Sequence, residues 1–181
     1  PSCVITTNWD CLLESAIEIT GALYSVVCSD KDLVKSTMNK KLIKMHGDFK
    51  NHNIVFKEDD YLSYSHNFPL VENYIKSILS THTVLFLGYG YNDINLKHIM
   101  KWIQNHSKYS PPKYLVVSKE NNSQSNYLKS HGIKTLNLAS LKLNPSEINK
   151  YSSLPERSKE TSYLLDDIKN LRFKQENDLS D

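Results

Sequence analysis

The chain has 181 residues, of which 39% are hydrophobic and 23% are charged, so it carries enough apolar side chains to fold and is not a disordered protein. The formal net charge is +2, Arg occurs only at positions 157 and 172, and no apolar run approaches the roughly 20 residues of a membrane span, so neither a nucleic-acid partner nor a membrane is indicated. Cys3, Cys11 and Cys28 are odd in number and have no Cys-x-x-Cys spacing, which argues against disulfide and zinc frameworks and favours the reducing cytoplasm.

Short apolar runs typical of strands alternate with stretches of helical periodicity. In chain order, we expect a strand at 4–7, a helix from about Asp10, strands at 23–27 and 42–45, a helix after Pro69, a strand at 83–87, a helix after Asp93, a strand at 114–117, a short helix ending near His131 and a strand at 134–138. The helices beginning near Asp10 and after Pro69 should be half-buried. This alternation predicts an α/β fold with a mainly parallel sheet, and the continuously apolar runs 83–87 and 114–117 predict central strands covered by helices on both faces.

The character of the chain changes beyond about residue 144. Pro145 and Pro155 interrupt this stretch, and residues 159–177 read as a polar helix with one apolar face. We therefore expect one domain over residues 1–144 and a helical appendage or linker over residues 145–181. The chain opens on an apolar run with no initiator Met, so we interpret it as an excised fragment.

Polar residues follow three of the predicted strands. Residues 6–10 (Thr-Thr-Asn-Trp-Asp), 46–48 (His-Gly-Asp) and 88–93 (Gly-Tyr-Gly-Tyr-Asn-Asp) stand where each strand ends. Each stretch has a purely structural explanation as a turn, a helix cap or a close helix–strand approach. Because ligands of open parallel sheets bind at the carboxyl ends of strands, their joint placement indicates an active site. The remaining histidines have no metal-ligand spacing, and no metal site is expected.

Four stretches of the sequence together resemble one family. They are Thr6 to Asp10 with Leu12 to Glu14, Leu42 to Gly47, Lys57 to Tyr61, and Leu87 to Asp93. In order and spacing they resemble the sirtuin-like family, particularly its bacterial, antiphage-defence branch that hydrolyses NAD. The resemblance covers about residues 3–138, and it implies a Rossmann-like, doubly wound fold with NAD in the cleft.

The resemblance also implies roles for individual residues. Asn8 matches the asparagine that positions the attacking group near the nicotinamide ribose, Asp10 the aspartate that holds the carboxamide, and His46 the general base. The residues expected to contact NAD are Thr6, Thr7, Gly88, Tyr89 and Asp93. The family's first strand and glycine-rich phosphate loop would precede residue 1, and Gly90 stands where relatives often carry Ser.

The function implied is NAD glycohydrolysis to nicotinamide and ADP-ribose by an antiphage effector that depletes NAD, with NAD as substrate and no metal. One alternative is a catalytically silent NAD-binding or assembly module. A second is an NAD-dependent protein deacylase, which three scattered cysteines disfavour because that group usually carries a four-cysteine zinc module. The expected partners beyond NAD are further copies of the chain, or a sensor or effector domain in the parent chain.

Overall fold

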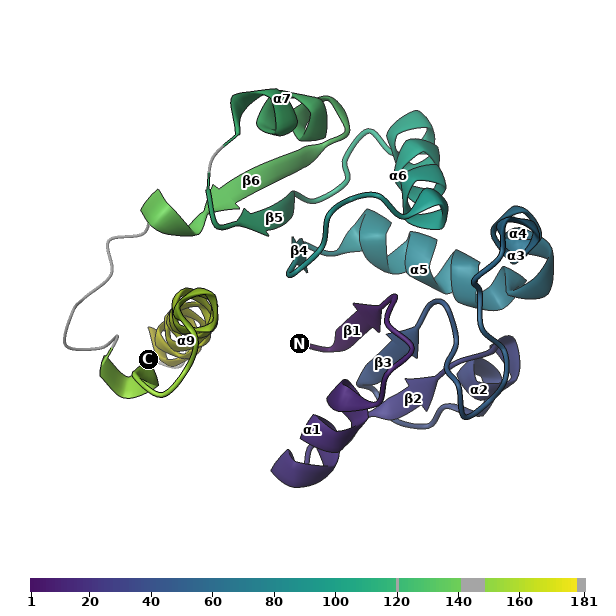
Figure 1. Cartoon of the computed structure of the whole chain (residues 1–181), viewed down its shortest axis with the longest axis horizontal. Coiled ribbons are helices and arrows are strands. Elements are labelled where there is room, and N and C mark those ends of the chain that lie inside the picture. Colours follow the sequence, from purple (N-terminus) through teal and green to yellow (C-terminus); the bar gives the residue numbers. More distant parts are fainter. Residues whose placement is uncertain (120, 141–148, 179–181) are drawn as a thin grey trace. The chain divides into compact units, whose positions relative to one another are not determined.

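The computed structural model describes residues 1–119, 121–140 and 149–178. The chain divides into two compact units, one formed by Pro1–His82 with Gly90–Pro111 and the other by Thr83–Tyr89 with the described part of Pro112–Asp181. Figure 1 labels the elements of both units. Each unit contains its own parallel sheet and is described by itself below.

The first unit is built on a three-stranded parallel sheet with the strand order β1-β3-β2. The strands are β1 (Cys3–Thr6), β2 (Ser25–Val27) and β3 (Lys41–Lys44). Thr6 pairs with Lys44 in the register of β1 and β3, so these two strands end at the same edge of the sheet. Leu42 and Ile43 of the central strand β3 are 0% exposed, which places the core of this unit around them.

Six helices belong to the first unit. They are α1 (Leu12–Thr20), α2 (Asp30–Lys35), α3 (Glu58–Leu62), α4 (Tyr64–Asn67), α5 (Pro69–Thr81) and α6 (Ile94–His106). Pro69 starts α5 because proline suits the first helical position, where no backbone N–H is required. Helix α5 packs between α2 and α6, and its buried Ile75 and Leu79 extend the core.

Helix α1 corrects one expectation. It starts where the sequence predicts and ends at Gly21, which takes a left-handed conformation with φ +64° that glycine adopts easily. None of its residues is buried, and Leu12 and Ile19 are 73% and 86% exposed. The predicted half-burial of this helix is therefore wrong: Ile17 is its one partly buried apolar residue, and no residue of the helix is fully buried.

The second unit contains a second three-stranded parallel sheet with the order β4-β5-β6. Its strands are β4 (Val84–Phe86), β5 (Lys113–Val117) and β6 (Ile133–Asn137). Helix α7 (Asn122–Ser130) packs against β6. The short 3-10 helices η1 (Leu138–Ser140) and η2 (Asn149–Tyr151) follow, and then the long helix α9 (Glu156–Asp178), all visible in Figure 1.

The predicted α/β, Rossmann-like fold class is confirmed, since every strand pairs in parallel with its neighbour within its own sheet and helices alternate with the strands. The strands form two three-stranded sheets, however, and β4 is a half-buried edge strand rather than a covered central one. The expected domain boundary at residue 144 lies outside the described residues. Within the described part of the chain, no helix combines the length and the apolar character needed to cross a membrane.

Candidate functional site

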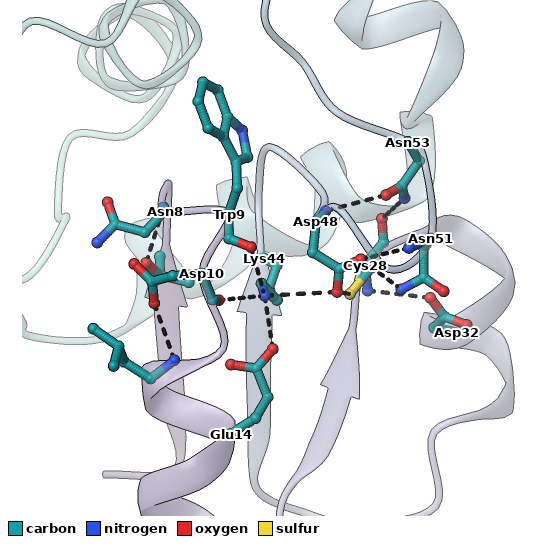
Figure 2. Close-up of polar contacts among 12 residues, drawn as sticks. Asn8, Trp9, Asp10, Glu14, Cys28, Asp32, Lys44, Asp48, Asn51 and Asn53 are labelled. Atoms are coloured by element: carbon teal, nitrogen blue, oxygen red, sulfur yellow. Dashed lines mark hydrogen bonds and ion pairs between the residues drawn. The ribbon is translucent and has the colours of Figure 1, made fainter.

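The turn that follows β1 carries two of the predicted catalytic residues, Asn8 and Asp10. The backbone N–H of Asn8 donates a hydrogen bond of 3.1 Å to Oγ1 of Thr6, which tightens the chain as it leaves the strand. The carboxylate of Asp10 accepts a hydrogen bond of 3.0 Å from the backbone N–H of Leu12, at the start of α1. Asn8 and Asp10 are exposed, so their side chains can meet a ligand, as Figure 2 shows.

The turn that follows β3 holds His46, which is only 4% exposed. Its carbonyl accepts a hydrogen bond of 3.1 Å from the backbone N–H of Val55, so a returning segment fixes the residue. The next residue, Gly47, has φ +68°, and a Cβ there would overlap the backbone carbonyl of Asn53. Only glycine therefore satisfies both the conformation and the space at this turn.

His46 faces a carboxylate from another element. Its Nε2 lies 2.9 Å from Oδ2 of Asp93, whose side chain is 8% exposed. The imidazole and the carboxylate are in close contact without the alignment of a full hydrogen bond. The ring of Tyr61 meets the imidazole edge-on, with ring centroids 5.3 Å apart.

Asp93 also begins α6, because its Oδ1 accepts a hydrogen bond of 2.8 Å from the backbone N–H of Leu96. Burial acts to raise the pKa of Asp93, but the contact with His46 and the hydrogen bonds from the α6 backbone outweigh it and hold that pKa below its usual value. Asp93 therefore stays ionised beside the imidazole at neutral pH.

A buried lysine links the turn after β1 to the strand that leads to His46. The side chain of Lys44, at the end of β3, is 0% exposed, and its Nζ lies 2.6 Å from the carbonyl oxygen of Asp10 and 2.7 Å from Oε1 of Glu14. The carbonyl of Trp9 lies 3.5 Å away and Oδ2 of Asp48 3.6 Å away. Figure 2 shows these contacts converging on the one ammonium group.

Asp48, one of the partners of Lys44, makes further polar contacts. The thiol of Cys28 donates a hydrogen bond of 3.3 Å to Asp48, and the backbone N–H of Asn51 donates one of 2.7 Å to the same carboxylate. Burial acts to raise the pKa of Asp48, but these hydrogen bonds and the Lys44 charge lower it overall. Burial and the neighbouring Asp48 raise the pKa of Cys28 to about 12, so this thiol is not a nucleophile at neutral pH.

A family model adds independent evidence to this geometry. The model, described as a SIR2-like domain, matches residues 2–136. The chain belongs to the SIR2-like domain family. The match spans both units and includes every residue that the sequence nominated for the site.

Several curated relatives are similar to this SIR2-like chain. "Defense-associated sirtuin 2" of Bacillus subtilis is 34% identical over 178 residues, which is 94% of this chain. "NAD(+) hydrolase ThsA" of Cytobacillus dafuensis is 29% identical over 164 residues, or 83% of the chain, and its namesake in Bacillus cereus is 30% identical over 122 residues, or 64% of the chain. The chain spans 17%, 32% and 25%, respectively, of the lengths of these relatives.

The structure places six of the eight predicted site residues in one unit of the SIR2-like chain. They are Thr6, Thr7, Asn8, Asp10, His46 and Asp93. Gly88 and Tyr89 belong to the second unit, where Gly88 has φ +62° and the Tyr89 ring stacks on Phe86 with centroids 5.6 Å apart. In the described part of the chain, no three His, Cys, Asp or Glu side chains gather as a metal site would require.

Sequence reasoning missed the polar cluster around Lys44. Lys44, Glu14 and Asp48 lie in stretches that the sequence singles out, but no contact among them is predicted. One signal was available, because a lysine in the otherwise apolar run Leu42 to Met45 must bury its ammonium group and therefore needs partners. Those partners come from distant parts of the sequence, so the run alone could not identify them.

Proposed function

We propose that the protein is an NAD glycohydrolase, which cleaves the bond between nicotinamide and ribose to give nicotinamide and ADP-ribose, and that it acts in antiphage defence by depleting NAD. The observation that carries the proposal is the buried His46–Asp93 contact at the end of β3, beside the Asn8–Asp10 turn at the end of the paired strand β1. The relatives are named as a defence-associated sirtuin and as NAD(+) hydrolases, which supports the same reaction.

The chemistry needs three tasks, for which the site offers candidate groups. Nicotinamide leaves as the ribose becomes oxocarbenium-like, so the leaving group and the attacking water must be held in line. We assign to Asn8 the positioning of the water. We assign to Asp10 the binding of the carboxamide group of nicotinamide. The side-chain amide of Asn8 is exposed and makes no hydrogen bond to any described residue, so it is available for this task.

We assign to His46 the role of the general base, which accepts the proton of the attacking water. The ionised Asp93 favours a proton on Nε2, the nitrogen that faces it, and this leaves Nδ1 as the nitrogen able to accept a proton. Asp93 therefore acts on the reaction through His46, in addition to the NAD contact predicted for it. Thr6, Thr7, Gly88 and Tyr89 remain the proposed contacts to the rest of NAD.

We also propose that the reaction takes place in the cytoplasm and that the protein works as a homo-oligomer or together with a sensor or effector domain. The three cysteines are free thiols, which fits a reducing compartment.

The test is nicotinamide release from NAD by the full-length protein and its variants. His46→Gln is expected to lower turnover by about 10²–10⁴-fold, the usual contribution of a general base. His66→Gln is the matched control, because His66 is exposed and lies on α4, and it should retain full turnover. Thermal unfolding of each variant is measured in parallel. Full turnover of a folded His46→Gln protein would contradict the assignment of the base.

Asp10 needs its own test because its carboxylate also accepts the backbone N–H of Leu12, the first residue of α1. Asp10→Asn keeps an oxygen that can accept the Leu12 N–H but removes the negative charge, so stability should hold while NAD cleavage falls. Equal loss of stability and turnover would indicate that Asp10 is only a cap. If the wild-type protein binds NAD and releases no nicotinamide, the silent NAD-binding module becomes the better interpretation.

A further inference from the structure

The side chain of Lys44 is the most deeply buried charge among the described residues of the first unit. Its side chain is 0% exposed, whereas its partners Glu14 and Asp48 retain 19% and 5% exposure. Removing a lone ammonium group from water is very unfavourable, so a lysine in this position needs compensating contacts. The two carboxylates and two main-chain carbonyls around it supply them, as Figure 2 shows.

The contacts of Lys44 are directed at the turn that carries the proposed catalytic residues. Two of its four partners are the carbonyl oxygens of Trp9 and Asp10, and a third, Glu14, lies in the first turn of the helix that follows. Besides Lys44, the ring of Trp9 holds the turn, because it packs edge-on against Phe49 and Phe56 with ring centroids 5.9 and 5.5 Å apart. The other polar contacts within the turn are the local hydrogen bonds from Asn8 to Thr6 and from Leu12 to Asp10, each spanning two residues.

Lys44 also stands two residues before His46 on the same continuous backbone. The backbone N–H of Met45, between them, donates a hydrogen bond of 2.8 Å to the carbonyl of Thr6, at the end of β1. The ammonium group of Lys44 and this hydrogen bond therefore connect the turn after β1 to the end of β3 at two points. Burial acts to lower the pKa of Lys44, but Glu14 and Asp48 outweigh it and raise that pKa, so the ammonium stays charged at neutral pH.

We propose that Lys44 is a positioning residue for NAD cleavage: its buried ammonium group holds the Trp9 and Asp10 carbonyls, and so sets Asn8 and Asp10 at a fixed distance from His46. This inference rests on the proposed function, because it assigns Lys44 to the same site. Lys44 does not touch the substrate. A displacement of about 1 Å of a catalytic group is enough to cost about 10²-fold in rate, so a rigid anchor for the turn is a functional requirement.

The experiment compares three variants of the full-length protein. Lys44→Met removes the ammonium group and keeps the length of the side chain. Lys44→Met combined with Glu14→Gln also removes the main countercharge, so that no unpaired Glu14 destabilises the fold. Lys41→Met is the matched control, because Lys41 lies on the same strand but its Nζ contacts the carbonyl of Met38, at 2.8 Å, and not the catalytic turn.

Two readouts are needed, one for activity and one for the turn itself. Nicotinamide release should fall about 10- to 100-fold in both Lys44 variants and remain unchanged in Lys41→Met. Amide hydrogen exchange, followed by mass spectrometry, should accelerate in the peptide that covers residues 6–12. Exchange in the peptides from α5 and α6 should stay at the wild-type rate in the double variant.

The outcomes separate this inference from the proposed function. If the wild-type protein releases no nicotinamide, the proposed function fails, while the exchange of residues 6–12 still shows whether Lys44 anchors the turn. If the wild-type protein is active and the folded double variant keeps its turnover, the positioning role is overturned even where exchange accelerates. Acceleration of exchange throughout the unit, rather than in the turn, would also overturn it, since Lys44 would then stabilise the fold alone.

Discussion

At the scale of single residues, Gly47 is the position where conformation and space both restrict the side chain. Its φ of +68° is a left-handed conformation, and a Cβ would also overlap the carbonyl of Asn53. Gly47→Ala should therefore cost about 2–5 kcal/mol, the sum of a left-handed penalty and an overpacking penalty. Urea unfolding followed by circular dichroism measures this change.

Gly21 provides a matched control for this prediction. It has φ +64°, close to that of Gly47, but a Cβ there would meet no atom within 4 Å. Gly21→Ala should thus cost only the left-handed penalty of about 1–2 kcal/mol. Equal losses at the two glycines would show that the contact with Asn53 does not restrict the turn after His46.

At the scale of elements, one helix stabilises the start of another. Asp30, the first residue of α2, accepts hydrogen bonds of 3.0 and 2.9 Å from the backbone N–H groups of Leu70 and Val71, in the first turn of α5. A carboxylate at a helix N-terminus accepts hydrogen bonds from the free N–H groups and interacts favourably with the helix dipole. Asp30→Ala should therefore lower the free energy of unfolding by about 1–2 kcal/mol.

The control for Asp30 is Asp59→Ala. Asp59 also lies in the first turn of a helix, α3, but it is exposed and its carboxylate caps no second helix in the described chain. Its replacement should change the free energy of unfolding by less than about 0.5 kcal/mol. If both variants unfold at the wild-type urea concentration, the bridge from α2 to α5 does not contribute to stability.

Two of the predicted elements lie close to the positions that the sequence predicts. The strand at 42–45 and the helix after Pro69 appear within a residue or two of their predicted positions, because each carries its own signal. Helix α2 was missed, since its six residues include only Leu33 and Val34 as apolar side chains. The exposure of α1 could not be predicted either, because burial depends on which neighbours cover a helix and not on its own periodicity.

The same reasoning explains which parts of the site were predictable. His46 and the Asn8–Asp10 turn stand at strand ends, so an α/β pattern is enough to bring them to one edge. The contact between His46 and Asp93 joins residues 47 positions apart, and no local pattern specifies it. The partners of Lys44 are equally dispersed along the chain, and the pairing of β1 with β3 brings the Trp9 and Asp10 carbonyls to its ammonium group.

At the scale of the whole molecule, the lowered pKa of Asp48 predicts a pH dependence of stability. In the unfolded chain Asp48 has the ordinary Asp pKa of about 3.9, and in the folded protein its pKa is lower. At a pH between these two pKa values the unfolded chain therefore binds more protons than the folded protein does. The contribution of Asp48 is therefore fully present above the unfolded pKa and is lost as the pH falls through the folded pKa.

Asp48→Asn tests this dependence. At pH 7 the variant should unfold more easily than the wild type, by about 1–3 kcal/mol, because a charged and hydrogen-bonded group is lost. The difference should narrow as the pH is lowered from 5 towards 3, in urea unfolding measured at each pH. A difference that stays constant over this range would contradict the assignment, and Asp59→Asn serves as the exposed control.

The register of β1 against β3 has a consequence for how the proposed site forms during folding. Cys3 pairs with Lys41, so the two strands meet across 38 positions of sequence, and a chain must close this long loop before the ladder exists. A slip by one residue would shift the turn by about 3.3 Å and turn Lys44 to the opposite face of the sheet. Secondary structure that forms before this pairing therefore lacks the proposed site, so under the proposed function the onset of nicotinamide release during refolding reports this one pairing step.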